Sequence, residues 1–386
     1  MPVLAAHDLS GCSSLIKLPA SFGQLKMLDV MLDGCGSLTE LPDSLGDMEQ
    51  LKCLDLSGCS SLQCLPDTLG NLTAIEYLLL DKCVSLVSLP DSLSGLEELW
   101  LGKCSSIAEL PAALGRLTNI RKLGLMDCHS LKSVPDSLGQ LAVLEELWLS
   151  NCSSLEQLPR TLGQLAKLRL LLLTGCSSLQ SLPPALWYLP ALEVLRVQGC
   201  SALHSFPTSS GGLDAEAIRT STASLRYKQL LADYMAGKPL AGLQQLLELR
   251  IEGCEQLQSL PESLGQLSSL TFLHIQACSS ISSIPASIGQ LNALVDLRVM
   301  GCSGLLALPT SFALQLSALK RLHLDGCSSL ASLPELLGLS SLQHLHLEGC
   351  STLMQLPESL AKLCAVKHVS LAHCSSLDQL PAILAA

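Results

Sequence analysis

The stretch LEELWLSNCSSLEQLPRTLGQLAK, residues 144–167, contains the pattern that decides the fold. Its first part, from Leu144 to Cys152, reads L-x-x-L-x-L-x-x-C and ends in alternating apolar and polar residues. This alternation predicts a short strand with one buried face. The two serines after the cysteine suit a polar turn. Pro159 then opens a short helical or 3₁₀ segment, which Gly163 keeps short.

The same pattern recurs along the chain about every 24 residues, with a cysteine followed seven residues later by a proline. No unit can bury its apolar residues alone, but stacking places each leucine between its equivalents, and each buried leucine should stabilise the fold by roughly 1.5–3 kcal/mol. The period therefore predicts a stacked solenoid with fifteen parallel strands. The repeated cysteines are Cys12, Cys35, Cys59, Cys83, Cys104, Cys128, Cys152, Cys176, Cys200, Cys254, Cys278, Cys302, Cys327, Cys350 and Cys374.

The full repeat, L-x-x-L-x-L-x-x-C-x-x-L-x-x-L-P-x-x-L-G-x-L-x-x, resembles a leucine-rich repeat. Its consensus sequence, GCSSLxxLPxSLGxLxxL, is similar to the repeat region of plant nucleotide-binding leucine-rich-repeat disease-resistance proteins, especially those with an N-terminal Toll/interleukin-receptor-like domain. The expected fold is an α/β right-handed solenoid, or horseshoe. It would have a concave parallel β-sheet of about 15 short strands and short helical or 3₁₀ segments on the convex side. The resemblance implies a sensing region that binds an effector, although no nucleotide-binding, Toll-like or kinase segment is visible here.

One large interruption divides the repeats. We expect repeats one to nine in residues 1–207, an insertion in residues 208–237, and repeats ten to fifteen in residues 238–386, all within one continuous solenoid. The insertion is either a tolerated outer loop, with or without a short helix, or an island that packs back and frames a ligand site. Smaller changes in spacing, expected on the outer side, occur at residues 90–104, 312–316 and 337–339.

Charge and composition exclude several classes of protein. The net charge of −11 and an aromatic content of 3% argue against a nucleic-acid partner. No run of eighteen apolar residues occurs, so we expect no membrane insertion. The first residues do not read as a signal peptide. No phosphate-binding loop, G-x-S-x-G, H-E-x-x-H or kinase signature appears, so we expect neither enzymatic activity nor a cofactor.

Cysteine usage bears on the compartment. Fifteen of the eighteen cysteines occupy one slot of the repeat, which favours an internal column of reduced thiols and a cytoplasmic location. Cys53, Cys64 and Cys364 lie outside this column, and we expect Cys53 to face solvent and to be the most reactive thiol. Glycosylation sequons at Asn71 and Asn151 keep an extracellular interpretation open.

Residues that alternate with the strand leucines should line the concave face, where tryptophan and arginine are the residue types that anchor partners. Two tryptophans two units apart, hence roughly 10 Å apart, form the centre of an expected aromatic patch. A basic patch from Arg196 to Arg298 follows. The candidate partner-binding residues are Tyr77, Trp100, Trp148, Arg196, Arg250, His274, Arg298, His323 and His346.

Histidines and carboxylates are concentrated in the last repeats. The sequence contains no motif with four metal ligands at the usual spacing, so we expect no metal site. A solvated polar face, a zinc site and a pH-sensitive partner surface are the three interpretations of this cluster. For the whole chain we expect a non-enzymatic scaffold that recognises a protein or peptide, similar to the sensing region of a plant intracellular immune protein. An adaptor or substrate-reading subunit and an extracellular receptor fragment are the alternatives.

Overall fold

The computed structural model describes residues 6–207 and 243–380. These residues form two compact units, the first covering residues 6–177 and the second covering residues 178–207 and 243–380. The expected insertion at residues 208–237 lies outside the described residues. The grouping of the repeats around that insertion, and the continuity of the solenoid, therefore remain predictions.

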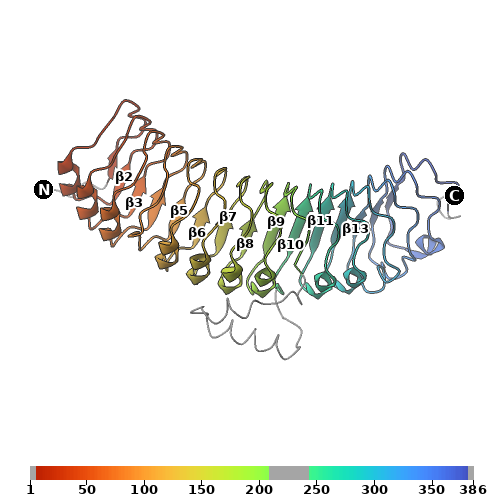
Figure 1. The fold of residues 1–386 in the computed structure, drawn as a ribbon. Helices are drawn as coiled ribbons and strands as arrows, with labels where there is room; N and C mark the ends of the chain where they lie inside the picture. The colour runs from red at the N-terminus through yellow and green to blue at the C-terminus, as the bar shows by residue number, and fades with distance from the viewer. Residues whose placement is uncertain (1–5, 208–242, 381–386) are drawn as a thin grey trace. The chain divides into compact units, whose positions relative to one another are not determined.

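The first unit is built on eight short strands, each parallel to and hydrogen-bonded with the next along the chain (Figure 1). A shift of one repeat carries each strand onto its neighbour, so equivalent residues face one another across every pair. The strands are β1 (Ala6–Asp8), β2 (Asp29–Met31), β3 (Cys53–Asp55), β4 (Tyr77–Leu79), β5 (Glu98–Trp100), β6 (Lys122–Gly124), β7 (Glu146–Trp148) and β8 (Leu170–Leu172).

The second unit continues the pattern with seven parallel strands. Its first four strands have five residues each, two more than the strands of the first unit. The strands are β9 (Val194–Gln198), β10 (Glu248–Glu252), β11 (Phe272–Gln276), β12 (Asp296–Met300), β13 (Arg321–His323), β14 (His344–His346) and β15 (His368–Ser370). The expected short parallel strands are thus confirmed.

Short 3₁₀ segments lie on the side of each unit away from the strands, as the repeat predicted (Figure 1). A proline precedes every one of them in extended conformation, so its fixed φ directs the chain into the turn. None of the described helices is long and apolar enough to cross a membrane. The segments are η1 (Ala20–Gln24), η2 (Asp43–Asp47), η3 (Asp67–Asn71), η4 (Ala112–Arg116), η5 (Asp136–Gln140), η6 (Arg160–Gln164), η7 (Pro184–Tyr188), η8 (Glu262–Gln266), η9 (Ala286–Gln290) and η10 (Glu358–Lys362).

The three irregular spacings coincide with repeats that lack a 3₁₀ segment. Turns or bends at residues 91–92, 310–315 and 337–338 take its place. Equivalent residues of the flanking strands still pair across each of these changes in spacing. The gained and lost residues therefore lie on the outer side, away from the strands, as expected.

The core of each unit is a set of apolar columns that run from repeat to repeat. Leu147, at the centre of β7, is 0% exposed and lies between Leu123 and Leu171 in register. Each such leucine contributes roughly 1.5–3 kcal/mol because its neighbours exclude water on both sides. The stacking therefore supplies the core that no single repeat could form.

The glycine inside the 3₁₀ segments has a different role from the one expected. Gly139 is buried, and a Cβ placed on it would lie 2.5 Å from the Cβ of Thr161 in the next repeat and 2.7 Å from that residue's carbonyl oxygen. Its φ is not positive, so conformational freedom is not what the position requires. Glycine is needed because successive repeats approach closely there.

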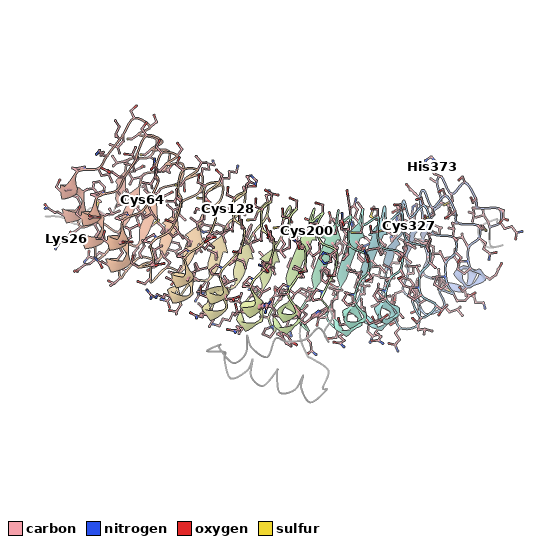
Figure 2. The ribbon with its side chains drawn as sticks, in the orientation of Figure 1. Lys26, Cys64, Cys128, Cys200, Cys327 and His373 are labelled. Atoms are coloured by element: carbon pink, nitrogen blue, oxygen red, sulfur yellow. The ribbon has the colours of Figure 1, made fainter. Side chains whose placement is uncertain are left out.

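The cysteine column is confirmed within both units. None of the eighteen cysteines forms a disulfide, and thirteen of the fifteen column cysteines are buried, the exceptions being Cys12 and Cys374. Cys128, Cys200 and Cys327 of this column are labelled in Figure 2. The Cys152 thiol donates a hydrogen bond to the Leu125 carbonyl oxygen of the preceding repeat at 3.1 Å. Burial raises the pKa of this thiol to about 12, so it stays protonated and can donate.

Cys53 lies on the outward side of β3, as expected, but its environment does not favour the reactivity expected of it. The Cys53 side chain is half-buried on β3, and burial together with Asp29 and Asp55 raises the pKa of its thiol to about 11. Because the thiolate is the reactive form, this environment disfavours reaction. Cys64 and Cys364, which are exposed, are the more accessible thiols outside the column.

Candidate partner-binding face

The outward side of the strands, here called the sheet face, carries all nine candidate residues. From β2 onward one leucine or valine of each strand points inward, namely the middle residue of a three-residue strand and the second residue of a five-residue strand, and the residues on either side of it point outward. Residues immediately before this inward residue form a first column from repeat to repeat, and those immediately after it form a second column. Tyr77 lies in the first column, and the other eight candidates lie in the second.

On the sheet face of the first unit, the structure brings Trp100 and Trp148 into contact. Their ring centroids lie 5.9 Å apart in an edge-to-face arrangement, much closer than the roughly 10 Å expected for two strands apart. Gly124 is the second-column residue of β6, the strand between them. A Cβ there would overlap the Trp100 ring, so the missing side chain lets this indole lie across β6 towards its partner.

Carboxylates of the first column hold both indoles. The Trp100 Nε1 donates to Glu98 Oε2 at 2.9 Å, and the Trp148 Nε1 donates to Glu146 Oε2 at 3.0 Å. Lys122 in turn contacts Glu98 Oε1 at 3.1 Å. Because the indole N–H groups are already satisfied, the parts of the rings left for a partner are apolar. Within the described residues, Tyr77 makes no ring contact with either indole, so it flanks the pair from β4.

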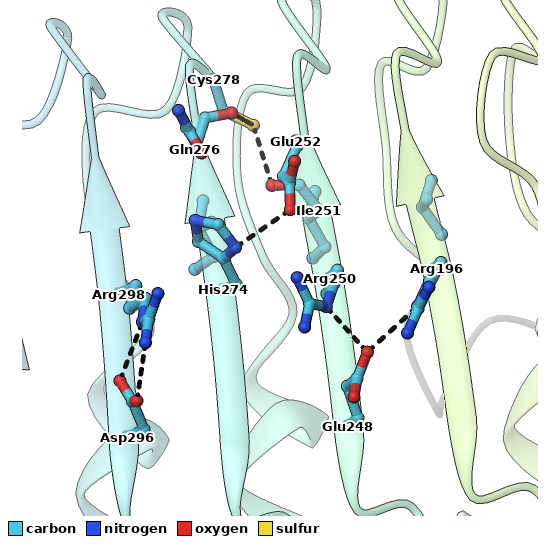
Figure 3. Close-up of polar contacts among 12 residues, drawn as sticks. Arg196, Glu248, Arg250, Ile251, Glu252, His274, Gln276, Cys278, Asp296 and Arg298 are labelled. Atoms are coloured by element: carbon cyan, nitrogen blue, oxygen red, sulfur yellow. Dashed lines mark hydrogen bonds and ion pairs between the residues drawn. The ribbon is translucent and has the colours of Figure 1, made fainter. Parts of the chain in front are cut away.

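On the sheet face of the second unit, the arginines are paired with carboxylates (Figure 3). Glu248 Oε1 accepts from Arg196 Nε at 3.1 Å and from Arg250 Nε at 2.7 Å. Burial raises the pKa of Glu248, but the two guanidinium groups outweigh burial and hold that pKa below its ordinary value. The expected basic patch is therefore a charge-compensated network, and its carboxylate comes from the first column.

A second network of the same kind lies around Asp296, which is only 2% exposed. Its two carboxylate oxygens accept from Arg298 Nε and Nη2, both at 3.1 Å, and Arg321 Nε donates to Oδ2 at 2.7 Å. Burial acts to raise the pKa of Asp296, but these guanidinium groups keep it below 3.8. The network fixes the arginine side chains in place.

Phe272 separates the two networks. The guanidinium carbon of Arg250 lies 4.8 Å from the centre of its ring, and that of Arg298 lies 5.3 Å from the same point. The ring is half-buried. Cation–π attraction of this kind contributes about 0.5–1 kcal/mol at partly exposed sites, so Phe272 belongs to the face as much as the predicted arginines do.

His274, which was expected to face a partner, is largely removed from solvent. It is 7% exposed, and its Nδ1 lies 2.9 Å from Glu252 Oε1 (Figure 3). Burial lowers the pKa of His274, Glu252 opposes that effect, and Arg298 and Arg250 reinforce it. The imidazole is therefore neutral near pH 7. It lies beneath the more exposed side chains of the sheet face, where a partner would make little contact with it.

The histidines of the last strands gather in space. The rings of His323 and His346 are stacked with centroids 4.3 Å apart and an interplanar angle of 8°. The His368 ring lies 5.1 Å from that of His346. Asp325 is placed so that its Oδ2 lies 3.6 Å from His323 Nδ1. One potential ligand atom from each of His323, Asp325 and His346 lies within 4.8 Å of the other two.

The third tryptophan shows how position in the repeat decides the role of a residue. Trp187 lies in η7, is 3% exposed, and donates from Nε1 to the Pro207 carbonyl oxygen at 2.7 Å. It stabilises the outer side of the second unit and is no part of the sheet face.

Comparison with known proteins identifies the class. A profile described as a leucine-rich repeat region matches residues 3–130, and a leucine-rich repeat profile matches residues 143–165. A search of curated proteins gives no match. Both matching profiles describe leucine-rich repeats, and the stacked parallel strands with 3₁₀ segments form a leucine-rich-repeat solenoid fold.

Solved structures with similar folds come from several settings. A leucine-rich-repeat protein of Leptospira interrogans is 26% identical, with 94% of each chain covered and a TM-score of 0.46. A TDR receptor is 18% identical, with 98% of this chain and 67% of the other covered and a TM-score of 0.47. TLR13 in complex with ssRNA13 is 19% identical, with 91% of this chain and 49% of the other covered and a TM-score of 0.53. At this level of identity the TLR13 likeness concerns the fold alone.

Proposed function

We propose that this chain is a non-enzymatic scaffold that recognises a protein or peptide through its sheet face. The observation that carries the proposal is the Trp100–Trp148 pair, which is half-buried, contacts edge to face, and is held by Glu98 and Glu146. Large aromatic side chains held in one orientation lose little entropy when a partner binds, and tryptophan is enriched among residues that dominate binding energy.

The second unit offers a complementary surface. Guanidinium groups held in register by Glu248 and Asp296 are pre-organised donors, so a partner with carboxylate or carbonyl groups could contact them without first ordering their side chains. Because these charges are compensated, we expect orientation and specificity from this region rather than strong long-range attraction.

At a finer level, we propose that the partner is an effector-type ligand and that the chain acts as the sensing region of a plant-type intracellular immune protein. The consensus sequence of the repeat, GCSSLxxLPxSLGxLxxL, supports this assignment through its resemblance to the repeats of plant disease-resistance proteins. The thiol column supports a reducing, cytoplasmic location, because eighteen unpaired cysteines persist where thiols are kept reduced. An adaptor or substrate-reading subunit remains the alternative that the same surface would serve.

The test is a quantitative affinity capture from plant extract with the intact chain as bait. Proteins bound through the sheet face should be lost with the double variant Trp100→Ala/Trp148→Ala. They should be retained with the control Val87→Ala, which removes a 59% exposed apolar side chain outside the strands. Capture of the same proteins by the double variant, with its fold intact by circular dichroism, would contradict recognition through this surface.

The finer proposal is tested by comparing extracts of infected and uninfected tissue. An immune sensor should retain a pathogen protein that is present only in infected tissue, whereas an adaptor should retain the same host proteins from both extracts. Recovery of only common host proteins would remove the immune assignment and leave recognition by the sheet face intact.

A further inference from the structure

His323, Asp325 and His346 form a compact group on the sheet face of the second unit. His323 and His346 are direct partners in the parallel register of β13 and β14, and their rings are stacked at 4.3 Å. Asp325 follows His323 by two residues, so its side chain emerges on the same face of the sheet. The facing atoms, His323 Nδ1 and Asp325 Oδ2, are 3.6 Å apart.

The carboxylate is oriented by the backbone. Asp325 Oδ1 accepts a hydrogen bond from the backbone N–H of Glu348 at 2.9 Å, which leaves Oδ2 directed at His323. Ligands of bound metal ions are commonly held by such outer hydrogen bonds, which set their orientation before the ion arrives. Asp325 therefore already has the arrangement of a metal ligand.

The imidazole of His323 has unused binding capacity. Its side chain is 17% exposed, and its buried Nε2 makes no hydrogen bond within the described residues. Buried polar nitrogens without a partner are rare in folded proteins, because each one forfeits its hydration. Since the ring can turn about its side-chain bonds, either nitrogen can be presented to a ligand.

The charge balance of the group also suits a cation. Burial lowers the pKa of His323, and His346 and Arg298 lower it further, whereas Asp296 and Asp325 oppose these effects. The carboxylate of Asp325 supplies a negative charge beside the two rings. Arg298, the residue before His323 in the second column, has its charge compensated by two hydrogen bonds to Asp296.

We propose that His323, His346 and Asp325 bind one divalent transition-metal ion of the zinc type. Tetrahedral zinc with bonds of about 2.0–2.2 Å requires ligand atoms about 3.3–3.5 Å apart, close to the 3.6 Å between His323 Nδ1 and Asp325 Oδ2. The ligand atoms of the group span at most 4.8 Å, so the half-buried His346 ring must shift by about 1 Å and also turn out of its stack on His323 for both rings to face one ion.

Imidazole and carboxylate ligands favour zinc and its neighbours in the first transition series over magnesium or calcium. Three protein ligands leave one position open for water or for a group supplied by a partner. The site does not depend on the proposed function, because it is defined by residues of this chain alone. A bound ion would add a further contact point to the sheet face beyond its tryptophans and arginines.

The test is a calorimetric titration of the full chain, without a histidine tag, with Zn²⁺ after chelator treatment. Exposed thiols also bind zinc, so the titration uses a background in which Cys12, Cys64 and Cys364 are replaced by serine. We expect one ion per chain. Co²⁺ bound at the same site should give visible absorption bands without the near-ultraviolet band of a thiolate ligand.

Ligand variants assign the site. His323→Ala, His346→Ala and Asp325→Asn should each weaken Zn²⁺ binding by at least about tenfold. The control His204→Ala, an exposed histidine of the same unit, should leave the affinity unchanged. Because all four side chains are outside the core, circular dichroism should be unaltered in every variant. Absence of saturable binding below about 0.1 mM, or equal affinity in the ligand variants and the parent, would overturn the proposal.

Discussion

Two neighbouring residues of one strand, Leu147 and Trp148, separate the stabilising side of the sheet from its recognition side. Leu147 is 0% exposed and packs between Leu123 and Leu171, so Leu147→Ala leaves a cavity that the flanking repeats cannot fill. The expected loss in free energy of unfolding is about 3 kcal/mol.

Trp148→Ala removes a larger side chain at a lower cost. Its ring is half-buried on the sheet face, and its contacts there are the edge-to-face arrangement with Trp100 and the hydrogen bond to Glu146. Edge-to-face aromatic pairs contribute about 1 kcal/mol. Leu147→Ala should therefore destabilise the protein by about 2 kcal/mol more than Trp148→Ala does, which is a factor of roughly 30 in the folding equilibrium.

The assay is urea unfolding followed by far-ultraviolet circular dichroism, combined with hydrogen exchange of the β7 amides. The exchange measurement is needed because long repeat arrays can lose cooperativity, so a single midpoint need not report on one repeat. A Trp148→Ala variant that loses as much stability as Leu147→Ala would refute the division of the strand into an inward and an outward side.

Four further substitutions test other parts of the structure. Gly139→Ala should destabilise the protein by about 2 kcal/mol in urea unfolding, because the new Cβ meets backbone of the next repeat. Lys103→Gly should stabilise it by up to about 1 kcal/mol, since φ at this position is +64°. Gly124→Ala should abolish the coupled near-ultraviolet circular dichroism of Trp100 and Trp148 with little change in melting temperature, because the new Cβ meets the Trp100 ring and no backbone, and this half-buried ring can turn away about its side-chain bonds. Asp296→Asn should cost about 2 kcal/mol at pH 7, because it weakens the charge-assisted hydrogen bonds from the two arginines that flank it.

The pH dependence of Asp296→Asn follows from the sign of its pKa shift. The pKa of Asp296 is lower in the folded protein than the ordinary value of 3.8, so its ionised form contributes stability above about pH 4. That contribution is lost as the pH falls through the folded-state pKa. The difference between the parent and the variant should therefore shrink in acid, and a difference that grows below pH 4 would contradict the assignment.

For the other three substitutions, the following results would contradict the reasoning behind the expected effect. Gly139→Ala without loss of stability would mean that the repeats have room to separate at this point. A destabilising Lys103→Gly would show that the lysine side chain contributes more than its backbone strain costs. If the coupled circular dichroism of Trp100 and Trp148 persists in Gly124→Ala, the position of the Trp100 ring does not depend on the absence of a side chain at residue 124.

The repeat period predicted the strands and 3₁₀ segments because every unit is a near copy of the next. A single register then fixes all the others, and the changes in spacing at residues 90–104, 312–316 and 337–339 could be placed on the outer side without coordinates. The cysteine column followed from the same argument, since one slot in the repeat becomes one line in the structure.

The arrangement of the sheet face could be predicted only in part. The period placed Trp100 and Trp148 in one column, but their contact depends on side-chain rotation over Gly124, which the repeat does not encode. The pairing of Arg250 with Glu248 depends on contacts between the first and second columns, whereas the repeat pattern aligns residues only within one column. Burial of Cys53 between two carboxylates was missed for the same reason.

The most direct test of the account is a count of reactive thiols before and after unfolding. Stacked repeats with an internal sulfur column predict fast reaction at the three exposed cysteines, Cys12, Cys64 and Cys364, in the folded protein, and reaction at all eighteen after denaturation under nitrogen. The buried thiols should react orders of magnitude more slowly because the surrounding repeats cover them, and burial also raises the pKa of thiols such as Cys152 and Cys302, which suppresses their thiolate form. Rapid modification of most thiols in the folded state, or fewer than eighteen free thiols after unfolding, would contradict the central claim.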